Sequence, residues 1–406
     1  MTAPHDPQPL IAVVGMIGSV HAARWLKAVR AGPFRFVVLP VVRDQVAAPE
    51  FDPLIAVATA QEADALPAGA IGLWHGDLWR EPDVLPPPIH FRDRSSLACA
   101  GGIADAVRAL RPVLVHSMEL QHAGYACLGA AERMAMDFPP WLVSNWGSDI
   151  QLYRKLPAHR PVLEAIARRM DAYHSECERD IALARELGYR GPRLAAIPAS
   201  CGACFATLPT LSDLPPPSAR GDILIKGYHG WSGRALHVLS AVHLAAPRLR
   251  RFRIRIALAG PAVSAMADMI RLRDRLDIAV EPFAPSHAAA IARIARARMT
   301  VGLGISDGIG TSTLEAMALG SFPIVASSSC ATEWLRPDRD GFVLSPHDVA
   351  GMARALQAAA EDDALVDAAA LRNRRHVEAH WDSAGNGSAA SAIYMQLLAR
   401  THRDRA

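Results

Sequence analysis

Residues 305–327 read ISDGIGTSTLEAMALGSFPIVAS, and the order of residue types in this stretch indicates the class of fold. A polar loop that contains Asp307 and Gly310 follows an apolar run. A helical pattern begins at Ser312 and ends at Gly320, after which the apolar run FPIVA predicts a strand. Strand, loop, helix and strand in this order are typical of a βα unit in a parallel sheet.

The same alternation of apolar β-branched runs and helical patterns extends through most of the chain. Strands are predicted at residues 11–14, 36–39, 113–115, 141–143 and 194–197, and again at residues 223–225, 254–258, 278–280, 300–303 and 323–326. The predicted fold class is therefore α/β, with two Rossmann-like, doubly wound domains facing a cleft. Ligands of such sheets bind beyond the carboxyl ends of the strands.

The boundary between the two domains is predicted from a proline-rich segment. Residues 208–220, LPTLSDLPPPSAR, contain four prolines and no periodic apolar pattern, which predicts a semi-rigid linker. We therefore expect an N-terminal domain over residues 1–207 and a C-terminal domain over residues 221–380. Residues 381–406 are expected to form a C-terminal helix.

Composition excludes several classes of protein. The chain has 406 residues, 51% apolar and 20% charged, and a net charge of +3, which argues against disorder and against a nucleic-acid partner. No apolar run is long enough to span a membrane, and the N-terminus lacks a signal peptide pattern. These features predict a cytoplasmic protein and leave open a peripheral contact with the inner face of the membrane. The single CxxC, Cys201 and Cys204, lacks the further ligands of a zinc site, so no metal is predicted.

The glycine-rich loop at residue 310 indicates a phosphate site. A loop of this kind that opens onto a helix directs backbone N–H groups and the positive end of the helix dipole outward. Gly310, Thr311, Ser312 and Thr313 are therefore predicted to bind a phosphate.

Glu315 has two readings from the residues alone. Its carboxylate can accept hydrogen bonds from both hydroxyls of a ribose. Alternatively, Ser312 and Glu315 match the S-x-x-E capping box, in which Glu315 would only cap its own helix.

Residues 314–318 (LEAMA), Gly320 and residues 322–326 (FPIVA) resemble the C-terminal domain of retaining, nucleotide-sugar-dependent glycosyltransferases of family 4, which have the GT-B fold. The resemblance implies that Glu315 binds the ribose of the donor and that Asp307 lies near the transferred sugar. The family usually has Glu at both acidic positions, and Asp307 is one methylene shorter.

A pair of basic residues carries the same resemblance. Residues 223–227 (ILIKG) and the following Gly233 and Arg234 resemble the first strand and helix of that domain. The resemblance implies that Lys226 and Arg234 act in catalysis by neutralising the donor diphosphate, whose negative charge grows as it leaves. Two surface cations at the start of a helix are the alternative.

In the first half, Gly15, Gly18 and Ser19 resemble the glycine loop of the family, which approaches donor and acceptor. His21 follows this loop and is a candidate for the acceptor side. Residues 145–149 resemble a loop of the same family, where Asp149 either faces the cleft or caps the following turn.

Glu119 and His122 follow the strand predicted at residues 113–115 and are further candidates for contact with the acceptor. Many family members have a second histidine two residues after the one matched by His116, and Met118 stands there instead. A structural role is at least as good a reading of His116.

The resemblance implies a retaining glycosyltransferase that moves a sugar from a nucleotide-diphosphate donor to a hydroxyl of a saccharide or lipid-linked acceptor, in polysaccharide or glycoconjugate biosynthesis. The GT-B fold also implies that the helix at residues 381–406 crosses back to the N-terminal domain. No cofactor and no metal are expected, and the oligomeric state is not predicted. A sugar-nucleotide epimerase and a non-catalytic nucleotide-sugar-binding protein of the same fold are the alternatives. A nicotinamide-dependent oxidoreductase is disfavoured because the first loop is G-x-x-G and not G-x-G-x-x-G.

Overall fold

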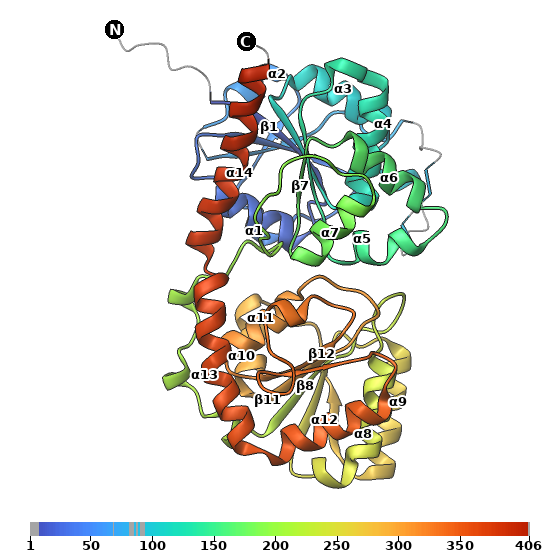
Figure 1. Cartoon of the computed structure of the whole chain (residues 1–406), viewed down its shortest axis with the longest axis vertical. Helices are drawn as coiled ribbons and strands as arrows, with labels where there is room; N and C mark the ends of the chain where they lie inside the picture. Colours follow the sequence, from blue (N-terminus) through green and yellow to red (C-terminus); the bar gives the residue numbers. More distant parts are fainter. Residues whose placement is uncertain (1–7, 68, 81–84, 87, 90–93, 405–406) are drawn as a thin grey trace. The chain divides into compact units, whose positions relative to one another are not determined.

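A computed structural model describes residues 8–67, 69–80, 85, 86, 88, 89 and 94–404. The chain divides into two compact units. The first comprises Met1–Ala203 and Ser383–Ala406, and the second comprises Cys204–Asp382. Each unit contains one parallel sheet with helices on both faces (Figure 1).

The sheet of the first unit has seven parallel strands in the order β3-β4-β2-β1-β5-β6-β7. Its strands are β1 (Leu10–Gly15), β2 (Arg35–Pro40), β3 (Leu54–Val57), β4 (Ile71–Trp74), β5 (Leu114–Met118), β6 (Trp141–Ser144) and β7 (Ala172–His174). The central strands are buried along their whole length, as expected for a sheet covered on both faces.

Helices cover both faces of this sheet. The helices α1 (Val20–Val29) and α14 (Ser383–Asp404) pack on one face in a common apolar core, while α3 (Ala100–Leu110) and α4 (Tyr125–Met134) lie on the other (Figure 1). The remaining helices are α2 (Ala60–Asp64), α5 (Ser148–Gln151), α6 (Arg160–Arg169) and α7 (Glu178–Glu186). The structure thus assigns the C-terminal helix to the first unit.

A buried polar network joins α14 to the sheet. Trp25 Nε1 donates to the Tyr394 hydroxyl at 2.9 Å, and that hydroxyl lies 2.8 Å from His116 Nδ1. His116 Nε2 lies 2.7 Å from Ser144 Oγ, which lies 2.9 Å from His174 Nδ1. Burial lowers the pKa of His116 well below its usual range and that of His174 to about 4, so both rings are neutral near pH 7. His116 is therefore a structural histidine.

The sheet of the second unit has six parallel strands in the order β10-β9-β8-β11-β12-β13. Its strands are β8 (Asp222–Lys226), β9 (Arg253–Ala257), β10 (Asp277–Val280), β11 (Ala297–Gly302), β12 (Phe322–Ala326) and β13 (Phe342–Leu344). Together the two sheets confirm the predicted α/β class with two doubly wound, Rossmann-like halves.

The helices of the second unit form two layers. On one face α8 (Ala235–Leu249), α9 (Pro261–Asp274) and α12 (Val349–Glu361) share an apolar core with the sheet. On the other face α10 (His287–Arg296) and α11 (Thr311–Ala318) form a second core, and α13 (Asp363–His380) packs against α11. In neither unit is any helix of the described residues both long and apolar enough to cross a membrane.

Residues 208–220 do not lie between the two units but within the second. They form the short 3-10 helices η7 (Leu211–Asp213) and η8 (Pro217–Ala219). The Arg220 guanidinium donates to Pro215 O at 2.8 Å and to Leu319 O at 2.9 Å, and burial lowers its pKa to about 10. The prolines thus mark a segment packed onto a domain, and the units meet in sequence at residues 203 and 204.

One predicted strand is also wrong. Residues 194–197 form a loop, although Leu194 and Ile197 are buried. The Ile197 N–H donates to Ser175 O at 3.0 Å, so the apolar run packs on the core without joining the sheet. A short apolar run fits a buried strand and a buried loop equally well.

Removal of the Tyr394 hydroxyl tests how much the polar network stabilises the first unit. In Tyr394→Phe the buried Trp25 N–H and the ring nitrogen of His116 lose that partner, so we expect a loss of about 1–3 kcal/mol in the free energy of unfolding. The midpoint of thermal melting should fall. Met395→Ala, at a half-exposed position of the same helix, is the control and should melt close to wild type. Equal midpoints for Tyr394→Phe and wild type would contradict a stabilising role of the network.

Candidate functional site

The sheet of the second unit has a topological switch point between β8 and β11. The chain continues from β8 to β9 and β10 on one side, then returns to β11 on the other. Lys226 is the exposed last residue of β8. A Cβ atom built on Gly302, at the end of β11, would lie 3.6 Å from the Cβ of Lys226, so the lysine stem lies along the end of the neighbouring strand. Ligands of parallel sheets bind at such a point.

The loops that follow β8 and β11 are joined by backbone hydrogen bonds. The Arg234 N–H donates to Leu303 O at 3.0 Å, and the Ile305 N–H donates to Ser232 O at 2.8 Å. Gly233 is required at this crossing because a Cβ atom there would come within 2.1 Å of Tyr228 O. The start of α8 is therefore fixed relative to the end of β11.

Arg234 is the N-cap residue of α8 and is half-buried. Its Nη1 donates to Gly233 O at 2.8 Å and to Gly230 O at 3.1 Å. Guanidinium has five N–H donors, so these two bonds leave further donors for an anion. Lys226 and Arg234, predicted from the sequence as a pair, thus flank one switch point.

The helix α11 begins at Thr311, and its N-cap residue is Gly310, which has no side chain to cap the first turn. A Cβ atom built on Gly310 would lie 3.4 Å from Asp307 Oδ2, 3.6 Å from Thr313 Oγ1 and 3.9 Å from Ser312 Oγ. Asp307 Oδ1 accepts from the Gly308 N–H at 3.0 Å. The carboxylate and both hydroxyls therefore surround the start of the helix.

The capping-box reading of Glu315 is wrong. A capping box joins the N-cap residue to the third residue of the helix, and Glu315 is the fifth residue of α11. Its side chain is 10% exposed, and Oε1 lies 2.7 Å from Nε2 of His287, the first residue of α10. Sequence reasoning missed His287. A histidine 28 residues from Glu315, on another helix, gives no signal in the sequence.

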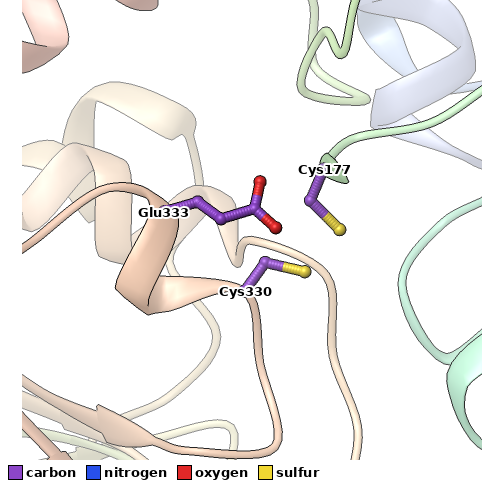
Figure 2. Close-up of side chains that lie close together, drawn as sticks. All are labelled: Cys177, Cys330 and Glu333. Carbon is purple, nitrogen blue, oxygen red and sulfur yellow. The ribbon is translucent and has the colours of Figure 1, made fainter. Parts of the chain in front are cut away.

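A third loop, which follows β12, forms hydrogen bonds with the loop between β11 and α11. Ser328 Oγ donates to Gly304 O at 2.5 Å, and the Cys330 N–H donates to Gly308 O at 2.9 Å. Figure 2 shows Cys330 and Glu333 on the segment that leads through the short 3-10 helix η9 (Ala331–Glu333). The loop that carries Asp307 is thus tied to its neighbours on both sides.

The first unit has its own switch point, between β1 and β5. Gly15 ends β1, and a Cβ atom there would lie 3.3 Å from the Cβ of Met118. Gly18 N–H donates to Gln45 Oε1 at 3.3 Å, and Ser19 caps α1 by accepting from the Ala22 N–H at 3.4 Å. Ser19 is thus a helix cap.

Close to this switch point, the ring of His21 lies 5.7 Å from that of Trp146, which lies in the loop that leads into α5 and Asp149. His21 and Asp149, both predicted for the acceptor side, therefore lie in the first turns of two helices that start in the same region.

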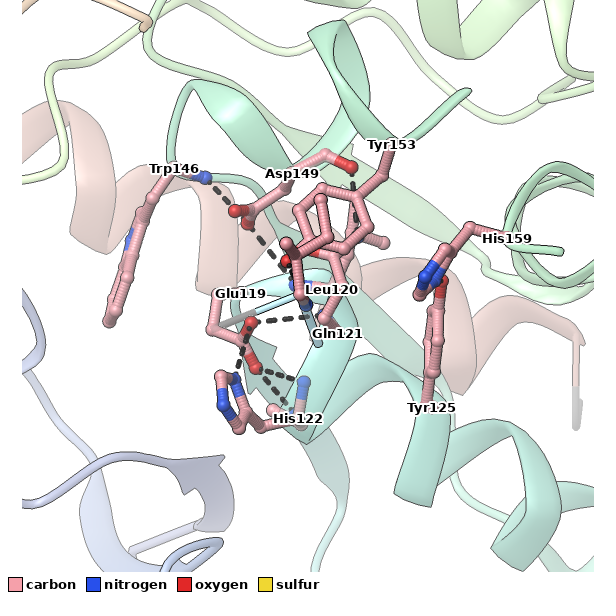
Figure 3. A network of polar contacts seen from close by, with 11 residues as sticks. Glu119, Leu120, Gln121, His122, Tyr125, Trp146, Asp149, Tyr153 and His159 are labelled. Carbon is pink, nitrogen blue, oxygen red and sulfur yellow. Dashed lines mark hydrogen bonds and ion pairs between the residues drawn. The ribbon is translucent and has the colours of Figure 1, made fainter. Parts of the chain in front are cut away.

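Glu119 follows β5 and anchors the next turn (Figure 3). Its carboxylate accepts from the N–H groups of Gln121 at 3.0 Å, His122 at 2.6 Å and Ala123 at 2.6 Å, and lies 3.0 Å from His122 Nδ1. Burial alone raises the pKa of Glu119, but His122 and these N–H groups bring it below its ordinary value. The backbone of Glu119 has φ 80° and ψ 160°, a conformation that only glycine adopts without strain.

The strained residue leads into a single π-helical turn, η3 (Leu120–Gly124), which continues as α4. The hydrogen bonds that the Glu119 carboxylate accepts from the N–H groups of residues 121–123 offset the backbone strain at Glu119. Such turns are frequent at functional sites.

Asp149 joins two loops and does not cap α5. Its Oδ2 accepts from the Trp146 N–H at 2.9 Å and from the Leu120 N–H at 3.2 Å. Burial, and then the charge of Glu119, raise the pKa of Asp149 well above its ordinary value. Glu119 and His122 are also at most 5% exposed. The geometry therefore favours structural anchoring for these three residues over the predicted contact with an acceptor.

Within either unit taken separately, the described residues bring no three histidine, cysteine or carboxylate ligand atoms within 4.8 Å of one another.

Part of the second unit matches a known protein family. Residues 231–362, which include Arg234, Asp307 and Glu315, match the family model of glycosyl transferases group 1. No curated protein is significantly similar to the chain in sequence.

Many solved structures are similar to this chain, and three of them match nearly all of it. Sucrose-phosphate synthase from Thermosynechococcus elongatus is 15% identical with a TM-score of 0.70, and the alignment covers 97% of this chain and 100% of that one. Anabaena HepE in complex with UDP-glucose is 11% identical with a TM-score of 0.65, covering 96% and 100%. The pneumococcal O-GlcNAc transferase GtfA in complex with UDP and GlcNAc is 10% identical with a TM-score of 0.65, covering 96% and 99%.

These likenesses confirm the predicted GT-B fold. The second unit carries the segment that matches the group 1 glycosyl transferases. The identities are too low to transfer an activity from any of these neighbours.

The raised pKa of Asp149 predicts a pH-dependent stability. The folded chain binds the Asp149 proton more tightly than the unfolded chain, so this group's contribution is present at low pH and is lost as the pH rises above 3.8 through the folded-state pKa. Asp149→Asn keeps an oxygen acceptor and removes the charge. The melting midpoint of the variant, relative to wild type, should therefore be higher at about pH 8 than at about pH 5.

Asp137→Asn, at an exposed position of the same unit, is the control and should show the same difference from wild type at both pH values. An Asp149→Asn difference that does not change with pH would show that burial of this charge does not limit stability.

Proposed function

We propose that the protein is a retaining glycosyltransferase, similar to those of family 4, that moves a sugar from a nucleoside diphosphate to an acceptor hydroxyl. The observation that carries the proposal is the switch point between β8 and β11. There Lys226 ends β8, Arg234 precedes α8, and the loop after β11 leads to a helix start without a side-chain cap. Glu315, a largely buried carboxylate, lies on that helix, eight residues beyond Asp307.

The cations and the helix start supply what a leaving nucleoside diphosphate needs. Negative charge grows on the diphosphate as the bond to the anomeric carbon breaks, and fixed cations at that point lower the barrier. Lys226 and Arg234 would neutralise the diphosphate. Backbone N–H groups at residues 310–313 would bind a phosphate oxygen, with the dipole of α11 adding to the attraction.

The two carboxylates would recognise the two ends of the donor. Glu315 would accept hydrogen bonds from ribose hydroxyls, and Asp307, beside the start of α11, would accept from hydroxyls of the transferred sugar. In a retaining reaction on one face of the sugar, the acceptor oxygen forms the new bond to the anomeric carbon as the phosphate oxygen leaves. The proton of the acceptor hydroxyl passes to that phosphate oxygen, so no protein base is required.

The ligands bound in structural neighbours agree with this class of donor. HepE has been solved with UDP-glucose and with UDP, and GtfA with UDP and GlcNAc. We propose a saccharide or lipid-linked acceptor, a role in polysaccharide or glycoconjugate biosynthesis, a reaction without metal and a cytoplasmic location with peripheral membrane contact.

Thermal shift with UDP-, GDP-, ADP- and CDP-sugars tests the proposal, because a ligand that binds the folded state raises its melting midpoint. The best donor is then incubated with saccharide acceptors, and the anomeric configuration of the product is determined. A product that keeps the configuration of the donor supports the proposal. Inversion refutes retention, an altered donor without acceptor indicates an epimerase, and binding without turnover indicates a non-catalytic binder.

Glu315→Gln should weaken donor binding. Gln keeps the size of the side chain but removes the charge, and loss of a charge-assisted hydrogen bond costs about 1.5–3 kcal/mol, or roughly 10–150-fold in affinity. Calorimetry with the donor measures this. Glu361→Gln, at an exposed carboxylate of the same unit, should bind as wild type does. An affinity for the donor equal to that of wild type in Glu315→Gln would contradict the role of Glu315 in binding the ribose.

Lys226→Ala should lower turnover more than ground-state binding, since its charge interacts most strongly with the diphosphate as it leaves. We expect a kcat reduced by about 10²-fold with a smaller change in the dissociation constant of the donor. Arg250→Ala, an exposed arginine in the turn between α8 and β9, is the control and should retain full turnover. Equal kcat in Lys226→Ala and wild type would contradict the role of this cation.

A further inference from the structure

We propose that His287 is a positioning residue, which orients Glu315 so that the carboxylate distinguishes a ribose from a deoxyribose in the donor. The proposal rests on the proposed function and adds a residue that the sequence did not indicate. Its basis is the contact of 2.7 Å between His287 Nε2 and Glu315 Oε1.

The burial of Glu315 explains why such a partner is needed. Its side chain is 10% exposed, and a carboxylate in that environment is costly unless hydrogen-bond donors satisfy it. The imidazole of His287 is one such donor, and a contact of 2.7 Å has the length of a strong hydrogen bond to a charged oxygen. The bond restricts rotation of the carboxylate group.

Helix packing fixes the relative position of the two residues. His287 is the first residue of α10, where Ser286 Oγ accepts from the Ala289 N–H at 3.2 Å and fixes the backbone of the first turn. Buried residues of α10 and α11 belong to the same apolar cluster, among them Ile291 and Ala316. The pair therefore connects two helices that already pack together.

An oriented carboxylate gains selectivity for a diol. A carboxylate offers about four lone-pair positions, so the bond to His287 leaves acceptor capacity in a fixed direction. Two vicinal hydroxyls match such an acceptor, whereas a deoxyribose offers only one of them. His287 is 46% exposed, so the pair has an open side from which a nucleoside could approach.

The test compares the affinities of UDP and 2′-deoxy-UDP, by calorimetry, in wild type, His287→Ala and His287→Gln. UDP is chosen because HepE and GtfA were solved with it. Wild type should prefer UDP by about tenfold or more, the value of one charge-assisted hydrogen bond. His287→Ala should bind UDP about 3–10-fold more weakly while its affinity for 2′-deoxy-UDP changes little, because loss of one orienting bond costs about 1 kcal/mol. His287→Gln, which can donate from its amide nitrogen, should restore the preference.

A matched control exists in the same unit. His243 and Asp274 also form a histidine–carboxylate pair, with Nδ1 and Oδ2 2.6 Å apart, between α8 and the end of α9. His243→Ala should leave both affinities as in wild type. It separates loss of the Glu315 contact from a general effect of removing an imidazole.

The outcomes separate this inference from the proposed function. An unchanged preference in His287→Ala, or an equal loss for both nucleotides, would overturn the role of His287 and leave the glycosyltransferase proposal standing. If UDP, GDP, ADP and CDP all fail to bind wild type, both proposals fall together.

Discussion

The change of chain direction between β8 and β11 is the constraint on which the geometry of the candidate site depends. Crossover connections cover the edge of a parallel sheet wherever consecutive strands are neighbours, but here the connections leave to opposite sides. The carboxyl ends of two adjacent strands therefore lie beneath separate loops. Lys226 ends one strand, and the loop that begins α11 follows the other, so a cation and a helix start become neighbours without any special sequence between them.

Three carboxylates near the switch points are largely buried, and each is satisfied in a different way. Glu119 accepts from three backbone N–H groups and Asp149 from two, so neither could release its partners without opening a turn of the backbone. Glu315 instead bonds to His287, a half-exposed side chain that can move without changing the backbone. A carboxylate that recognises a ligand must be accessible without a change of the backbone, and of these three Glu315, whose partner is a half-exposed side chain, meets that condition.

The sequence predicts the fold well because the central strands are long apolar runs. The edge strands β3 and β7 have only four and three residues, which is too short for such a signal. Composition predicted a linker at residues 208–220, whereas these residues lie within the second unit. The proline content indicates how stiff a segment is but not what it packs against. His287 and the backbone partners of Glu119 could not be predicted, since they depend on contacts between elements far apart in sequence.

The readings of Glu315 show how a single residue decides between a structural and a functional role. Ser312 at the N-cap would have placed Glu315 at the third helical position, where its carboxylate would close on the backbone. Gly310 takes the N-cap instead, so the helix starts earlier and Glu315 points to α10. In α1, by contrast, Ser19 caps its own helix. A serine that satisfies the N–H groups of its helix competes with a phosphate for them, whereas a glycine does not. The start of α11 is therefore better suited than that of α1 to bind the donor diphosphate.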